Sequence, residues 1–184
     1  MKKQFGVLSI ALLIAFVSSA QQFITKEGKI HFFSATAMEN IEATSKQAVC
    51  ALNTGTGKVF CKVVMTSFHF PSKFMEEHFN ENYMESEKYP YGVLDMALTQ
   101  PLDLKTDGVK DVVLKGTLEV HGVKHDYEIP GKITVVNGEP VHATAEFMVL
   151  LKDHNITIPT AVIAKIAESV KVDVAFDFKK YEKK

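Results

Sequence analysis

Apolar and polar residues alternate over long stretches of this chain, which is the pattern of a strand with one buried face. In residues 170–179, every second residue is apolar, and mostly lysine and aspartate lie between. Because most connections between such runs are short, neighbouring strands should be antiparallel. The pattern predicts an all-β fold, a barrel or a sandwich. The eight predicted strands are 29–34, 41–52, 58–68, 91–98, 111–120, 125–135, 141–149 and 170–179.

Two places along these strands should depart from regular pairing. The 41–52 run changes phase near Lys46-Gln47, which predicts a β-bulge. Pro130-Gly131 interrupts the 125–135 run. Proline cannot donate a ladder hydrogen bond, so we expect a kink or bulge there.

Two segments have the spacing of short amphipathic helices instead. The first, about 72–84, begins at Ser72, a residue type that favours the N-cap. The second, about 160–168, follows Pro159-Thr160. Each needs an apolar surface to lie on, and in a barrel that surface is an open end. The first helix is therefore expected to act as a lid.

The lid helix carries a polar pair, His78 and Asn82, at its apolar face. A polar group on a buried face has to be hydrogen-bonded. Two interpretations follow. Either His78 bonds a strand carbonyl and fixes the helix in place, or the pair contacts the polar head of a ligand.

The first twenty residues have the pattern of a secretory signal peptide. Lys2 and Lys3 precede an apolar run that is too short to span a bilayer, and small residues end at Ala20. We expect cleavage near Ala20 and a periplasmic or secreted protein. Residues 21–184 then form a single domain, with no later transmembrane segment.

The charge of the chain argues against nucleic acid as a partner. Without Lys2 and Lys3, 19 basic side chains stand against 22 acidic ones, and none of them is arginine. Nucleic-acid binders usually present a basic face with arginine at the phosphates.

Cys50 and Cys61 flank a predicted hairpin with a two-residue turn at Gly55-Thr56. This register places them opposite each other, so they are a candidate disulfide in an oxidising compartment. The alternative is that both are small core residues, because they share the apolar face of their strands.

No catalytic motif is found, and the sequence predicts neither an enzyme nor a cofactor. His121 and His125 straddle a tight turn, with Asp126 or His142 as further candidate ligands. Two histidines are too few for a zinc site. Exposed loop histidines are the favoured interpretation, and no metal is predicted.

Three stretches resemble the YceI-like family of polyisoprenoid-binding proteins, in a form typical of exported Bacteroidetes members. They are EEHFNENYMESEKYP, LKGTLEVHGVKHDYEIPG and FMVLLKDHNITIP, the last with His154 where the family has an aromatic residue. The resemblance spans about residues 23–180. It implies an eight-stranded antiparallel, lipocalin-like β-barrel with an apolar tunnel that holds an isoprenoid chain. Since arginine is absent, neutral quinone-like lipids are open as ligands beside phosphorylated ones.

The leading hypothesis is a non-catalytic carrier of an apolar isoprenoid-like lipid, such as a polyisoprenoid or a quinone. The alternatives are a ligand-free structural or stress-related barrel and, third, a lipid-modifying enzyme that uses His78. A homodimer is also left open. Small residues at predicted inward positions, namely Gly116, Ala143, Ala145 and Ala97, either interlock with large ones or leave a hole. The candidate ligand contacts are Phe68, Phe70, Phe74, Met75, His78, Phe79, Asn82, Tyr83, Gly116, Leu118 and Phe147.

Overall fold

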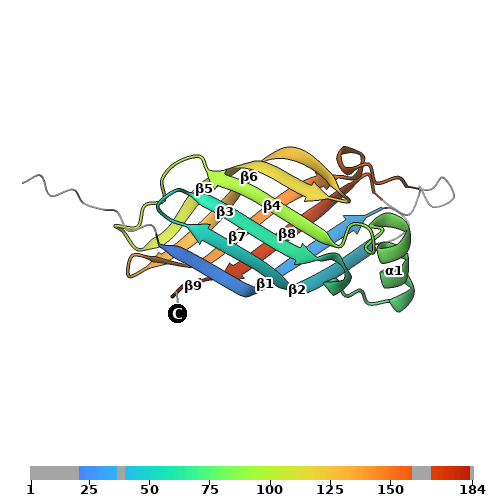
Figure 1. Cartoon of the computed structure of the whole chain (residues 1–184), viewed down its shortest axis with the longest axis horizontal. Coiled ribbons are helices and arrows are strands. Elements are labelled where there is room, and N and C mark those ends of the chain that lie inside the picture. Colours follow the sequence, from blue (N-terminus) through green and yellow to red (C-terminus); the bar gives the residue numbers. More distant parts are fainter. Residues whose placement is uncertain (1–20, 37–39, 159–166, 183–184) are drawn as a thin grey trace, which may run out of the picture.

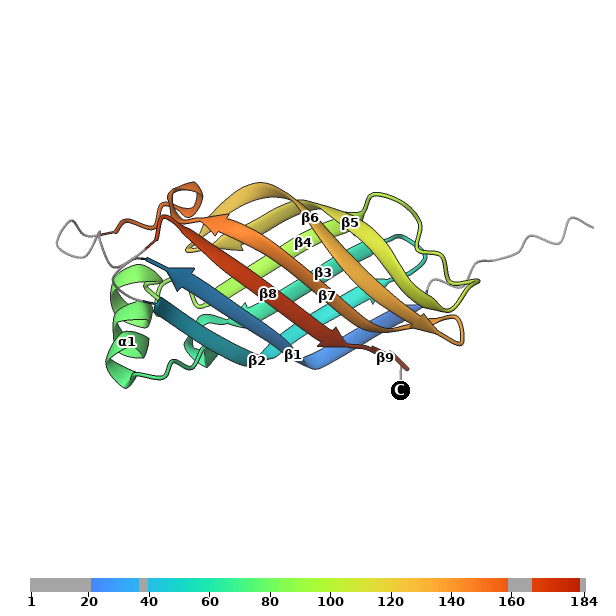
Figure 2. The ribbon, with the colours of Figure 1, turned by 180° about the vertical axis from the view of Figure 1, so that it is seen from behind.

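The chain forms one closed antiparallel β-barrel (Figures 1 and 2). The computed structural model describes residues 21–36, 40–158 and 167–182. The strands are β1 (Gln22–Ala35), β2 (Asn40–Asn53), β3 (Lys58–Val64), β4 (Tyr91–Leu98), β5 (Gly108–Val120), β6 (Val123–Val136), β7 (Glu139–Leu150), β8 (Ser169–Asp177) and β9 (Lys179–Lys180). The helical pieces are η1 (Met65–Ser67), α1 (Lys73–His78), η2 (Phe79–Tyr83) and η3 (Leu151–His154).

Each strand from β2 to β8 pairs with its neighbour in sequence, and β1 pairs with both β8 and β2. This last pairing closes the barrel of eight strands, which confirms the predicted fold class. The short β9 adds two pairs to the beginning of β1. Strand β1 begins seven residues before the predicted start at 29, because Phe23 and Thr25 also point into the core.

The predicted bulge near Lys46-Gln47 is confirmed, because the register of β1 with β2 shifts between Ile30↔Ser45 and Gly28↔Ala48. The bulge predicted at Pro130-Gly131 is wrong. Pairing of β6 with β5 runs through Pro130 without a shift, and the irregularity with β7 lies at Thr134 and Val135. Instead, the ladder between β6 and β7 ends at Gly131, so Pro130 pairs with β5 alone.

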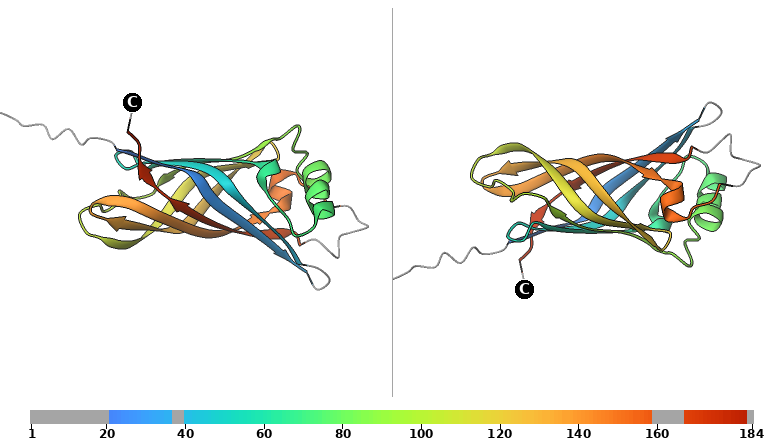
Figure 3. Two further views of the ribbon diagram at one scale, coloured as in Figure 1. Left: turned by 90° about the horizontal axis from the view of Figure 1, so that it is seen from below. Right: turned by 90° about the horizontal axis from the view of Figure 1, so that it is seen from above.

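The predicted lid helix is present as α1, which continues into the π-helical turn η2. Ser72 takes the N-cap position, but its side chain makes no capping hydrogen bond. The helical segment lies at the same end of the barrel as η3 (Figures 1 and 3). Most of the second predicted helix, about 160–168, lies outside the described residues, and Ala167 and Glu168 are not helical.

The predicted register of the β2–β3 hairpin is confirmed, with Cys50 opposite Cys61. The predicted two-residue turn is wrong. Gly57, not Gly55, has the positive φ, and its N–H donates to the Asn53 carbonyl across a four-residue loop.

The barrel wall is incomplete at two places near the helical end. Residues 49–52 of β2 pair with β3, and the part of β2 before them leaves β3. On another side of the barrel, residues 123–130 of β6 pair with β5 alone, and residues 146–150 of β7 pair with β8 alone. We call these places the β2/β3 seam and the β6/β7 seam.

Candidate functional site: the barrel lumen

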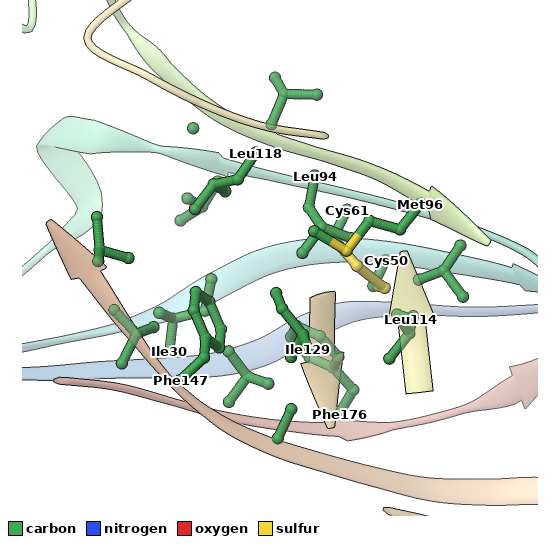
Figure 4. Close-up of a pocket in the computed structure, with 18 of the residues that line it drawn as sticks. Ile30, Cys50, Cys61, Leu94, Met96, Leu114, Leu118, Ile129, Phe147 and Phe176 are labelled. Atoms are coloured by element: carbon green, nitrogen blue, oxygen red, sulfur yellow. A yellow bond between two sulfur atoms is a disulfide. The ribbon is translucent and has the colours of Figure 1, made fainter. Parts of the chain in front are cut away.

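The inside of the barrel holds an apolar cavity of about 220 Å³ (Figure 4). Its wall comes from all eight strands and from the helical end, because each strand turns every second side chain inward. The lining residues include Phe32, Phe68, Phe79, Met84, Leu118, Ala143, Phe147, Leu151, Ile156 and Val172. For scale, an apolar cavity of roughly 150 Å³ stays dry and takes up benzene.

Partial exposure of inward residues shows that the lumen is hollow. Val172, Val174 and Ala143 face inward, yet they are only half-buried. In a barrel packed shut, such side chains would be fully enclosed by their neighbours across the lumen. These inward positions of β7 and β8 carry small or β-branched side chains, which leave space in the lumen.

Two of the four predicted small inward residues are placed correctly. Ala143 and Ala145 line the cavity. Ala97 points outward, because Met96 beside it fills the inward position. Gly116 serves a close approach of strands instead, since a Cβ there would lie 2.4 Å from the Asp95 carbonyl oxygen of β4.

The eleven candidate ligand contacts separate into three groups. Phe68, Phe79, Leu118 and Phe147 line the cavity. Phe70 and Tyr83 pack against the buried core behind it, and Met75 is half-buried. Phe74, His78 and Asn82 are exposed, and Gly116 lies in the wall. The role of these residues as ligand contacts stays a prediction.

The polar pair of the lid helix does not enter the barrel. The His78 ring packs on Phe74 at 4.1 Å between centroids, and its Nδ1 lies 3.3 Å from Asn82 Nδ2. Both residues are exposed, so the expectation that His78 sits on a buried face is wrong. The face that packs inward carries Phe79, whose ring stacks on Phe32 at 5.5 Å and meets Phe70 at 5.0 Å.

A disulfide joins Cys50 and Cys61 in the wall of the lumen (Figure 4). The bond links β2 to β3 within the short stretch where these strands pair. The prediction of a disulfide between these cysteines is therefore confirmed. Both residues are also buried core members.

The sequence did not reveal a buried polar cluster beside the lumen, which is centred on His154. This residue is 0% exposed. Its Nδ1–H donates to the Val123 carbonyl at 3.0 Å, and its Nε2 accepts from the Tyr127 hydroxyl at 3.1 Å. The available signal was the family resemblance, which puts an aromatic residue, a usually buried type, at the position of His154.

Burial lowers the pKa of His154, because a charged imidazole would lose its hydration there; the nearby His125 acts in the same direction. Burial raises the pKa of Tyr127, with help from the charge of Asp153. Both shifts favour the neutral forms that the hydrogen bond between them needs.

His121 is not the exposed loop histidine that was expected. Its side chain is 13% exposed, and its two ring nitrogens face Glu85 and the His154 carbonyl. His125 is exposed as expected, at 46%. Within the described ranges, no group of three or more His, Cys, Asp or Glu side chains has a metal-binding arrangement.

Residues 14–178 match the model of the YceI-like domain. The chain belongs to the YceI-like domain family. Among the helices of residues 21–36, 40–158 and 167–182, none is long and apolar enough to cross a bilayer. No curated protein matches this YceI-like chain in sequence.

Solved structures with the same fold include three distant relatives. A polyisoprenoid-binding domain from Saccharophagus degradans, implicated in plant cell wall breakdown, has a TM-score of 0.71 at 12% identity, covering 88% of this chain and 99% of that one. Burkholderia cenocepacia BcnA has a TM-score of 0.62 at 13% identity, covering 80% and 94%. The Campylobacter jejuni YCEI protein has 0.57 at 12%, covering 98% and 94%. At such identities the likeness establishes the fold alone.

Proposed function

We propose that this YceI-like protein is a non-catalytic carrier of an apolar isoprenoid-like lipid, held in the barrel lumen. The observation that carries the proposal is the hollow, almost wholly apolar lumen. An empty apolar cavity forfeits packing energy, so a lumen kept open is consistent with selection for a ligand. The polyisoprenoid-binding relative from Saccharophagus degradans supports the same class of ligand.

The chemistry of the wall supports a neutral ligand. Lys62 and Lys132 belong to strands that form the lumen, but their ammonium groups turn outward. One lies over the Tyr91 ring, and the other bonds Asp111 at 3.1 Å. A phosphorylated lipid would need such cations at its head group, so we favour a quinone-like or unmodified isoprenoid.

The place of action belongs to the same proposal. The N-terminal signal sequence and the disulfide in the lumen wall both suit an exported protein, periplasmic or secreted.

Native mass spectrometry tests the proposal directly. The protein is exported from a bacterial host, purified without detergent, and weighed intact under native and denaturing conditions before organic extraction. A stoichiometric mass that extracts as a neutral isoprenoid lipid is the expected result. A protein that carries no lipid, and whose melting temperature does not change when farnesol or menaquinone is added, would favour the ligand-free structural barrel.

A matched pair of variants makes this test specific to the lumen. Ala143→Phe fills the cavity and should abolish lipid retention. Ala97→Phe makes the same change on an outward position and should leave retention intact. Equal lipid content in both variants would contradict binding in the lumen.

A further inference from the structure

The β6/β7 seam is a lateral gap in the wall of the lumen. Residues 123–130 of β6 have no ladder partner on the β7 side, and residues 146–150 of β7 have none on the β6 side. Inward side chains beside this gap, Ile129 and Phe147, line the cavity. Unpaired backbone edges are costly unless something else covers them.

The turn η3 covers the gap. It follows β7 directly and folds back toward β6, where the buried His154 ring donates to Val123 and accepts from Tyr127. The residues on each side of this histidine close the lumen, because Leu151 and Ile156 line the cavity. His154 is thus the hydrogen-bonded connection between a lumen-lining segment and the strand across the gap.

The same segment is tied to the helical end of the barrel. The His121 Nδ1 lies 3.2 Å from the His154 carbonyl oxygen, and its Nε2 lies 2.8 Å from the Glu85 carboxylate. Glu85 follows η2 and Met84, another lumen-lining residue. Three segments therefore meet at this end of the lumen, namely the residues after η2, the β5–β6 turn and η3. His121 and His154 connect them.

A second proton on His154 would disturb this junction. His154 already has one donor and one acceptor satisfied, and a second proton would place a charge at a fully buried site. The titratable groups around His154 are Tyr127 and His125 on β6, Asp153 on η3, and His121 at the β5–β6 turn. Among these, the Asp153 carboxylate is the group whose negative charge would compensate a positive His154. It lies 3.8 Å from His125.

We infer that the β6/β7 seam is the portal of the lumen and that His154 is its latch, which is closed when neutral and opens when protonated. The part that concerns a ligand rests on the proposed carrier function; the opening of the seam does not. A cavity of about 220 Å³ also needs such an opening to admit a long chain.

Hydrogen–deuterium exchange of the full mature chain tests the latch without any ligand. Exchange of residues 151–158, corrected for the intrinsic effect of pH, is compared at pH 7.5 and 5.5. We expect protection to fall by up to about tenfold, since one proton linked to opening changes the equilibrium by up to tenfold per pH unit below about pH 6.5, the ordinary pKa of histidine. Protection at the β2/β3 seam, residues 44–52, should stay constant.

Three variants assign the effect. His154→Gln keeps a polar amide but cannot titrate, and should remove the pH response of residues 151–158. Tyr127→Phe deletes only the hydroxyl partner, and should raise exchange there already at pH 7.5. His142→Gln, on the outer surface of β7 and bonded to Asp177, should respond like the natural protein. A His154→Gln protein whose pH response equals that of the natural protein would overturn the latch.

Release of a neutral apolar fluorophore, N-phenyl-1-naphthylamine, connects the latch to the lumen. Preloaded protein is mixed to pH 5.5, and release should be about tenfold faster than at pH 7.5, with no acceleration in His154→Gln. If exchange responds to pH but release does not, the seam is not the portal. If the fluorophore and extracted lipids never bind, the carrier function fails while the exchange result still decides the latch.

Discussion

The two seams of the barrel are closed by different chemistry. At the β2/β3 seam, a disulfide lies within the short paired stretch, the Ser45 and Ser67 hydroxyls bond at 2.7 Å, and main-chain hydrogen bonds join Thr44 to His69. At the β6/β7 seam, the side chains of His154 and Tyr127 bridge the two sides.

The difference teaches which side of the barrel can respond to its surroundings. Hydroxyls, main-chain amides and a disulfide keep the same charge between pH 5 and 8, so the β2/β3 seam is a permanent joint. Histidine is the side chain whose ordinary pKa lies in that interval. The proposed opening of the lumen is therefore at the β6/β7 seam, which a histidine holds closed, and not at the β2/β3 seam.

The largest effect should come from His154→Ala. The change leaves a cavity and removes the partners of the Val123 carbonyl and the Tyr127 hydroxyl. We expect the free energy of unfolding to fall by about 3–4 kcal/mol, measured by urea denaturation at pH 7.5. The control His142→Ala, at an exposed surface pair, should cost less than about 0.5 kcal/mol. Equal costs would mean that the buried bridge contributes nothing special.

Removal of the disulfide should rank second. Cys50→Ala with Cys61→Ala is expected to lower the free energy of unfolding by about 2–3 kcal/mol, because the closed loop no longer restricts the unfolded chain. Its exchange signature should appear at residues 44–52 and be absent at 151–158. A loss of protection at η3 instead would show that the two seams are not independent.

The pH dependence of stability should come third. The pKa of His154 is lowered by folding, so the unfolded chain binds the proton more readily once pH falls below about 6.5, its ordinary value. This residue therefore leaves stability unchanged above that pH and reduces it below, by at most about 1.4 kcal/mol per pH unit. Urea denaturation at pH 7.5, 6.5 and 5.5 should give a shallower decline for His154→Gln than for the natural protein.

The smallest effect should come from Ser67→Ala at the β2/β3 seam. The substitution deprives the buried Ser45 hydroxyl of its Ser67 partner, although it still accepts from the Gln47 N–H, and should cost about 1 kcal/mol. The cost should be the same at pH 7.5 and 5.5. Ser45→Ala with Ser67→Ala should cost less than the sum of the single changes, because the second change no longer breaks an existing bond. A cost that grows in acid would contradict the contrast between the seams.

Much of the barrel could be predicted from local pattern. Alternation along 170–179 and 111–120 correctly placed Val172 and Leu118 on the inward face, because strand side chains have a period of two. The same reasoning placed Ala97 on the wrong face of its strand, because a shift of one residue in the alternation exchanges the inward and outward faces. The lid helix was predicted in place, and Phe79 and Tyr83 pack inward as expected. Phe74, His78 and Asn82, predicted on the same face, are exposed.

The sequence by itself determined the strands, their antiparallel order, the Cys50–Cys61 register and the apolar inner face, because each depends on neighbours in the chain. Only the tertiary structure decided that the lumen is hollow, that the wall parts at two seams, and that His154 is buried in one of them. These features depend on how strands far apart in sequence meet around a closed barrel. A histidine in a loop carries no local mark of the carbonyl and hydroxyl that will surround it after closure.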